Sequence, residues 1–128
     1  MSNVPDDRVY SPQHIWLKMQ DSIIAIMGIT EFAQSELGDI VYIEPPDLDR
    51  EYQAGQVCAV VESVKTASDV YMPVNGRVIE VNGDLLDAPE MLNELPYENG
   101  WLCKIELPID TAIDSLLDAS QYEEYIAS

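Results

Sequence analysis

Short apolar segments separated by closely spaced turn residues are the feature of this sequence that most constrains its fold. Strand-like runs occur at Ile23–Ile29, Ile40–Ile43, Gln56–Glu62 and Arg77–Val81. Strands of this length, bounded by proline, glycine and polar clusters, are typical of a β sandwich or barrel. Because 128 residues fit one domain, we expect residues 1–128 to form a single, mainly β domain with helices at its periphery.

Two segments between these strands carry helix signals. Thr30 can cap a short helix, and Gly38 is a natural stop for it. Asp87 can cap a second short helix, and Pro96 marks its end. The sequence therefore predicts two short helices, one that begins at Thr30 and one that begins at Asp87.

Three further signals concern the second half of the chain. Asn75–Gly76 predicts a tight hairpin turn, since both residues accept a positive φ. The alternation from Trp101 to Leu107 predicts a strand with one apolar face. Asp110 or Thr111 can open a C-terminal helix.

The charge balance excludes several classes of partner. There are 24 acidic and six basic residues, for a net charge of −18. Nucleic acids and anionic membrane surfaces both require Lys and Arg, so we expect binding to neither. The same charge favours a monomer. The N-terminal residues have neither the basic region nor the apolar core of a signal peptide, so we expect a cytoplasmic protein.

The reactive side chains do not form a catalytic or metal-binding pattern. Cys58 and Cys103 lie far apart and make no CxxC motif, and His14 is the single histidine. We expect both cysteines to be buried thiols and expect no metal site. The chain also lacks a nucleophile–base pattern and a glycine-rich phosphate loop, so we expect no enzymatic activity.

One of the three lysines, Lys65, has an unusual setting. It lies between the strand-like segments Gln56–Glu62 and Ala67–Met72, so strand–turn–strand places it at or beside a hairpin apex. Two paired strands would hold the backbone there while the side chain moved freely. Such a position suits an amine that must reach other proteins.

The segment Glu62-Ser63-Val64-Lys65 resembles the lipoyl-lysine hairpin of the glycine cleavage H proteins. Further matches follow in the family's order: His14-x-Trp16, Gly28-Ile29-Thr30, Ala33-Gln34, Leu37-Gly38-Asp39-Ile40-Val41, Pro73-Val74-x-Gly76, Val78-x-Glu80-Val81-Asn82 and Pro96-Tyr97-x-x-Gly100-Trp101. The resemblance implies the barrel-sandwich hybrid fold of lipoyl domains, with lipoic acid attached covalently to Lys65 by a lipoate–protein ligase or a lipoyl transferase. It also implies that Glu62 helps that enzyme recognise the hairpin. Asp69 and His14 would lie at the cleft that receives the arm.

The identity of the cargo depends on position 15. The sequence has His14-Ile15-Trp16 where the family has His-Glu-Trp, and that glutamate belongs to the cleft that holds the protonated amine of the loaded arm. Isoleucine supplies no such counter-charge.

Two cargo hypotheses follow from the resemblance. In the first, the arm carries an aminomethyl group from glycine decarboxylase to aminomethyltransferase, and dihydrolipoamide dehydrogenase reoxidises it. In the second, the chain resembles the lipoate-binding proteins of sulfur oxidation and carries sulfur for a heterodisulfide-reductase-like complex.

Overall fold

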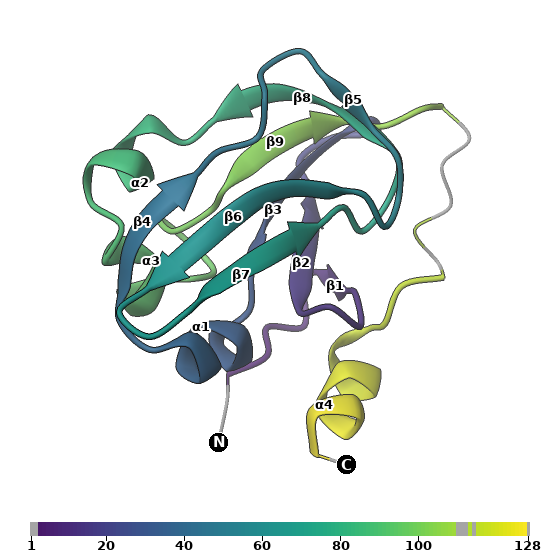
Figure 1. Ribbon diagram of the computed structural model, residues 1–128. Helices are drawn as coiled ribbons and strands as arrows, with labels where there is room; N and C mark the ends of the chain where they lie inside the picture. The colour runs from purple at the N-terminus through teal and green to yellow at the C-terminus, as the bar shows by residue number, and fades with distance from the viewer. Residues whose placement is uncertain (1–2, 110–112, 114, 128) are drawn as a thin grey trace.

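Two antiparallel β-sheets form the two layers of the molecule (Figure 1). The computed structural model describes residues 3–109, 113 and 115–127. The larger sheet has the strand order β1 (Val9–Tyr10), β2 (Ile15–Met19), β3 (Ile24–Ile29), β9 (Cys103–Glu106), β8 (Gly76–Val81) and β5 (Glu51–Tyr52). The smaller sheet has the order β4 (Ile40–Glu44), β6 (Val57–Ser63) and β7 (Ala67–Tyr71).

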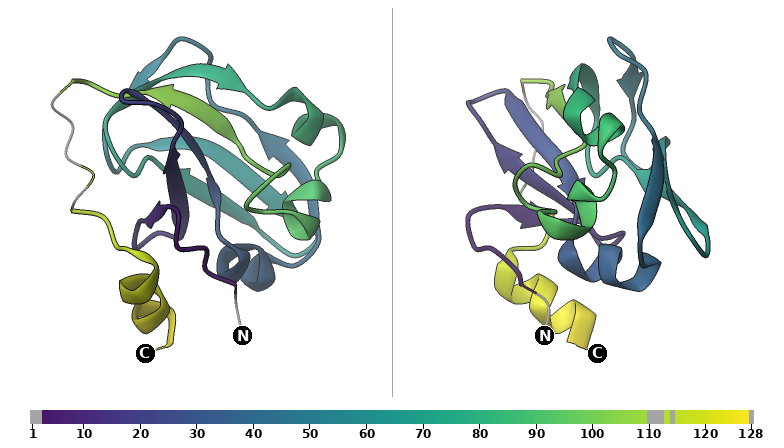
Figure 2. Two further views of the ribbon diagram at one scale, coloured as in Figure 1. Left: turned by 180° about the vertical axis from the view of Figure 1, so that it is seen from behind. Right: turned by 90° about the vertical axis from the view of Figure 1, so that its left-hand side faces the viewer.

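The core lies between these layers, which Figure 2 shows edge-on in its right-hand view. Alternate residues point inward along each strand, as the period of two requires. Met27 in β3, Val61 in β6, and Val78 in β8 are at most 1% exposed. Full burial of such a side chain contributes roughly 1.5–3 kcal/mol. The four strand-like runs named in the sequence analysis are confirmed as β3, β4, β6 and β8. Each strand begins within one residue of its predicted start.

The first predicted helix is confirmed as α1 (Glu31–Leu37). The Thr30 side chain accepts a hydrogen bond from the Ala33 N–H at 3.2 Å. Gly38 ends the helix with a φ of 85°, a conformation that favours glycine. The local signals at Thr30 and Gly38 were therefore enough to predict both ends of this helix.

The helix predicted to begin at Asp87 is wrong. The chain instead forms α2 (Gly83–Asp87), where Asp87 is the last residue, and α3 (Met91–Glu94). Asn82 explains the earlier start. Its buried side chain donates hydrogen bonds to two distant backbone carbonyls, those of Asn99 and Trp101, each at 2.8 Å.

The hairpin predicted at Asn75–Gly76 is also wrong. The chain crosses there from β7 in one sheet to β8 in the other. Gly76 does not have a positive φ. The space around it is tight, because a Cβ on Gly76 would lie 3.2 Å from Cδ1 of Ile105 and 3.3 Å from the Glu106 carbonyl oxygen.

The C-terminal helix is α4 (Ala119–Ala127). Its predicted starting residues, Asp110 and Thr111, lie outside the described part of the chain. A helix that opened at Asp110 or Thr111 would include Leu117, but Leu117 is extended and exchanges two backbone hydrogen bonds of 2.8 Å with Tyr10. The helix begins after Asp118, whose carboxylate accepts the Gln121 N–H at 2.8 Å.

Candidate functional site

A tight turn joins β6 and β7 (Figure 1). Lys65 lies in this turn and is exposed to solvent. The turn is closed by Ser63, whose N–H donates to the Thr66 carbonyl at 2.7 Å. The Ser63 hydroxyl also accepts from the N–H groups of Lys65 and Thr66, at 3.3 and 3.2 Å. One serine therefore fixes the backbone of the turn while the lysine side chain remains exposed.

The turn also contacts the segment that joins α1 to β4. The Val64 N–H donates to the Asp39 carbonyl at 3.0 Å. A Cβ on Gly38 would lie 3.6 Å from Cε of Lys65, so the lysine stem runs beside this glycine. These contacts hold the hairpin tip against α1, and the two elements lie side by side in both figures.

Asn93, in α3, stabilises this junction between α1 and β4 through three side-chain hydrogen bonds. Its side-chain oxygen accepts the Ile40 N–H at 2.9 Å, and its nitrogen donates to the Gly38 carbonyl and the Gln34 side chain, each at 2.8 Å. Sequence reasoning missed this residue, because its partners lie 53 to 59 positions away along the chain.

Lys65 differs from the other two lysines in its charge partners. Lys18 lies 3.3 Å from an Asp7 carboxylate oxygen, and Lys104 lies 3.7 Å from a Glu80 oxygen. Within the part of the chain that the structure describes, Lys65 makes no ion pair. Its amine is thus free despite the strongly acidic composition.

A cleft of about 250 Å³ opens along the hairpin, between β7, α1 and the start of β2. We call it the arm cleft. Its apolar lining consists of Ile15, Ile29, Phe32, Ala33, Leu37, Val61 and Val70, and its polar lining of Gln13, His14, Glu36, Ser68 and Asp69. Apolar walls with a few polar groups are the usual lining of a ligand site. Both hairpin strands contribute, so the arm cleft lies along the element that carries Lys65.

The structure brings two of the predicted site residues together and leaves one apart. His14 and Asp69 both line the arm cleft. Glu62 lies elsewhere, on the outer face of β6, where it is half-buried opposite Tyr42 of β4. A position on the open face of the hairpin is accessible to another protein.

Glu36 is a cleft residue that the site prediction did not include. Phe32, Ala33, Glu36 and Leu37 line the cleft from one side of α1, as their helical spacing allows. The sequence showed this spacing but not which element the helix would face. Ile15 is 1% exposed and uncharged, as expected, but the cleft still has two carboxylates, those of Glu36 and Asp69.

His14 is half-buried at one end of the cleft, and its Nδ1 lies 2.8 Å from the Tyr122 hydroxyl. Its backbone φ of 68° is unusual for a residue other than glycine. Burial lowers the pKa of His14, and the Glu36 carboxylate partly opposes that shift. The imidazole is therefore neutral at pH 7.

This lowered pKa predicts a pH dependence of stability. As pH falls below the ordinary histidine value of 6.5, the unfolded chain takes up a proton that folded His14 does not. The free energy of unfolding should therefore fall with pH, from about 6.5 downward until the folded imidazole also titrates. Urea unfolding of wild type and His14→Gln between pH 7.5 and 5.5 measures this. The variant should lose part of the slope, and identical slopes would contradict the prediction.

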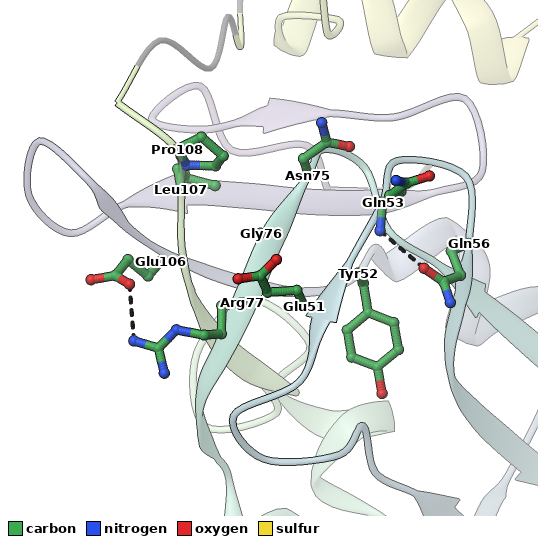
Figure 3. Close-up of a pocket in the computed structure, with 10 residues that line it drawn as sticks. All are labelled: Glu51, Tyr52, Gln53, Gln56, Asn75, Gly76, Arg77, Glu106, Leu107 and Pro108. Atoms are coloured by element: carbon green, nitrogen blue, oxygen red, sulfur yellow. Dashed lines mark hydrogen bonds and ion pairs between the residues drawn. The ribbon is translucent and has the colours of Figure 1, made fainter.

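A larger surface hollow, about 710 Å³, lies elsewhere, beside β5 and β8 (Figure 3). In Figure 1 these strands are at the opposite end of the molecule from the β6–β7 turn. Arg77 in this hollow is neutralised by Glu106 at 2.9 Å and by Asp49 at 3.1 Å. None of the predicted site residues lines it, so its size does not make it the functional site.

The two cysteines are buried and free in the structure. Burial raises the pKa of Cys58 to about 12 and raises that of Cys103 as well, so both remain unreactive thiols. Within residues 3–109, 113 and 115–127 there is no group of three or more metal-ligating side chains. In the same described ranges, no helix has the length and hydropathy to cross a membrane.

Comparisons with known proteins agree with this geometry. A family model described as Glycine cleavage H-protein matches residues 8–128. The chain is 48% identical to the glycine cleavage system H protein of Staphylococcus epidermidis over 123 residues, covering 96% of this chain and 97% of the relative. It is 49% identical to that of Staphylococcus haemolyticus, with the same coverage.

A solved structure supports the same assignment. The glycine cleavage system H protein of Mycobacterium marinum has a TM-score of 0.89 and 33% identity, covering 98% of this chain and all of that one. The predicted fold class, a mainly β barrel-sandwich hybrid with short peripheral helices and a C-terminal helix, is confirmed.

Proposed function

Because this chain belongs to the glycine cleavage H-protein family, it is a non-catalytic lipoyl carrier, and we propose that Lys65 is its lipoylated residue. Members of the family carry lipoic acid on a lysine. The free, exposed amine of Lys65 on a rigid turn is the observation that carries the proposal. Lys18 and Lys104 lie within strands and are ion-paired.

The arm cleft fits the group that Lys65 would hold. Acylation replaces a cationic amine by a neutral amide. When bound, lipoic acid supplies a ring disulfide whose strained dihedral makes it easily reduced. Asp69 lies four residues beyond Lys65, at most roughly 13 Å along the strand. We propose that the apolar walls of the cleft receive the acyl chain, and that His14 and Asp69 contact its outer end.

In glycine cleavage the arm carries an aminomethyl group, and the comparisons favour this role over sulfur transfer. Glycine decarboxylase, aminomethyltransferase and a lipoyl-attaching enzyme are the partners that this role implies. We propose further that the lipoyl-attaching enzyme recognises Glu62. We also propose that dihydrolipoamide dehydrogenase reoxidises the arm and that the chain acts as a monomer. The two free, buried thiols suit the reducing cytoplasm.

Incubation of the lipoylated protein with glycine decarboxylase and isotope-labelled glycine tests the cargo. We expect the label on the protein in a one-to-one ratio with lipoyl groups, and none on unlipoylated protein. Absence of label, together with acceptance of the protein by a sulfur-oxidising heterodisulfide-reductase-like complex, would overturn the aminomethyl role.

Ile15 cannot supply a counter-charge for the loaded arm, but two other residues of the cleft, Glu36 and Asp69, are acidic. The protonated amine of a loaded arm requires a counter-charge in a partly enclosed site. We propose that Glu36 of α1 and Asp69 of β7 supply it from opposite walls of the arm cleft. The negative potential of two carboxylates lowers the free energy of a cation placed between them.

The variant Glu36→Gln removes one of these charges with little change in shape. We expect the aminomethyl-loaded arm to decay roughly two- to fivefold faster, the effect of losing one exposed charge pair. Mass spectrometry of loaded protein over time measures the decay. Glu124→Gln, on the exposed side of α4, is the matched control and should behave as wild type. Equal decay of Glu36→Gln and wild type would refute the role of Glu36.

A further inference from the structure

We propose that Tyr122 of the C-terminal helix is a positioning residue of the arm cleft, which holds His14 through a chain of hydrogen bonds. This inference rests on the proposed use of the cleft by the lipoyl arm. Tyr122 is 0% exposed and does not itself line the cleft. It would act through the two residues that its hydroxyl joins.

The Tyr122 hydroxyl connects both walls of the cleft to α4. It lies 2.8 Å from Nδ1 of His14, immediately before β2, and 2.7 Å from Oγ1 of Thr30. Thr30 is the N-cap of α1, where its Oγ1 accepts the Ala33 N–H. One hydroxyl therefore fixes the position of the histidine relative to the helix that carries Phe32, Ala33, Glu36 and Leu37.

The three hydrogen bonds among Ala33, Thr30, Tyr122 and His14 can all run in one direction, with each hydroxyl donating to the next residue. Thr30 Oγ1 accepts the Ala33 N–H, so its own proton is available for the Tyr122 oxygen. Tyr122 can then donate to Nδ1 of His14. Burial raises the pKa of Tyr122 to about 12, so the phenol keeps its proton at neutral pH.

The proposed order of donors makes Nδ1 of His14 an acceptor. If Nδ1 accepts a hydrogen bond, the neutral imidazole carries its proton on Nε2. No hydrogen bond to Nε2 is present among the described residues. The Nε2–H is therefore available as a neutral donor to the lipoyl arm, beside the carboxylates of Glu36 and Asp69.

Packing keeps the hydroxyl of Tyr122 in place. The Tyr122 ring stacks on Tyr10, with centroids 4.7 Å apart and an angle of 13° between the planes. The His14 ring contacts Phe32 of α1 at 4.9 Å and the edge of Tyr122 at 5.8 Å. α4 thus forms part of the support of the arm cleft, although it lies outside the two sheets (Figure 1).

Nitrogen-15 NMR of the unmodified protein tests the hydrogen-bond chain directly, since the sequence has one histidine. We expect the Nε2–H tautomer at pH 7.5, with Nδ1 shifted by its hydrogen bond. In Tyr122→Phe, which keeps the ring, the Nδ1 signal should move to the position of an unbonded nitrogen. An Nδ1–H tautomer in wild type overturns the proposal without any variant.

The lipoylated protein tests the effect on the arm. Tyr122→Phe removes the hydrogen bonds to His14 and Thr30, and loss of the bond to His14 should speed decay of the aminomethyl-loaded arm roughly fivefold. Tyr52→Phe is the matched control, because it removes the hydroxyl of a buried tyrosine in β5 that accepts the Asp47 N–H at 2.9 Å, away from the cleft. It should leave both the His14 signals and the decay rate unchanged.

The outcomes separate this inference from the proposed function. If Lys65 is not lipoylated, the decay experiment has no substrate, but the histidine signals still report on Tyr122. If Tyr122→Phe alters those signals and the arm decays as in wild type, Tyr122 positions His14 without any role in retaining the cargo, and the inference is wrong.

Discussion

Lys65→Arg should fold as wild type does, receive no lipoyl group and reduce glycine cleavage in a reconstituted system to background. Arginine keeps the positive charge and roughly the length of the side chain, and residue 65 is exposed, so the fold should tolerate the change. Guanidinium does not act as the nucleophile that an activated lipoyl group needs, because it stays protonated. The expected loss of activity is therefore complete. Intact-mass spectrometry and circular dichroism measure modification and folding separately.

Lys18→Arg and Lys104→Arg are the matched controls. Both lysines lie in strands and make ion pairs that arginine can replace. Both variants should be lipoylated and active. A lipoyl adduct on Lys65→Arg, or loss of the adduct in either control, would show that the attachment site is not Lys65.

Gly100→Ala should destabilise the protein by about 3 kcal/mol, the upper part of the range for a group inserted into a packed site. A Cβ at Gly100 would lie 2.7 Å from the Leu95 carbonyl oxygen and 2.9 Å from that of Met91. Both are backbone atoms of the α3 segment and cannot move aside by rotating a side chain. The midpoint of urea unfolding measures the loss.

The position of Gly100 connects this stability effect to the site. The contacts of Gly100 are with α3, and Asn93 of that helix holds the junction on which the hairpin turn rests. Gly83→Ala is the control, since no atom lies within 4 Å of its added Cβ. That variant should be as stable as wild type or slightly more so. Equal stability of the two variants would show that α3 moves away from Gly100 freely.

Features fixed by neighbouring residues could be predicted from the sequence. The helix from Thr30 to Gly38 needs only a capping hydroxyl and a residue that accepts positive φ. The hairpin at Lys65 needs only two strand-like segments and a short turn between them. In both cases the determining contacts lie within a few residues along the chain.

Features fixed by distant residues could not be predicted. Asn75–Gly76 has the local signal of a hairpin, but pairing of Gly76 with Tyr52 directs the chain into the other sheet. Asp87 has the local signal of a cap, but the helix start is set by Asn82 and its partners near position 100. Such long-range hydrogen bonds override a local preference.

The candidate site divides in the same way. Lys65 was predicted from its own segment, whereas the roles that we propose for Glu36 and Tyr122 depend on the way α1 and α4 pack against the hairpin and β2. The expectation of a cleft without enough counter-charge followed from one position, Ile15. The fold supplies Glu36 from another element.

Peptide mapping of the wild-type chain, produced with a lipoyl-attaching enzyme and lipoic acid, tests the central claim most directly. We predict a single lipoyl group per molecule, located on the peptide that contains Lys65. A lipoyl group on Lys18 or Lys104, or a chain that remains unmodified beside an H protein that the same enzyme modifies fully, would contradict it.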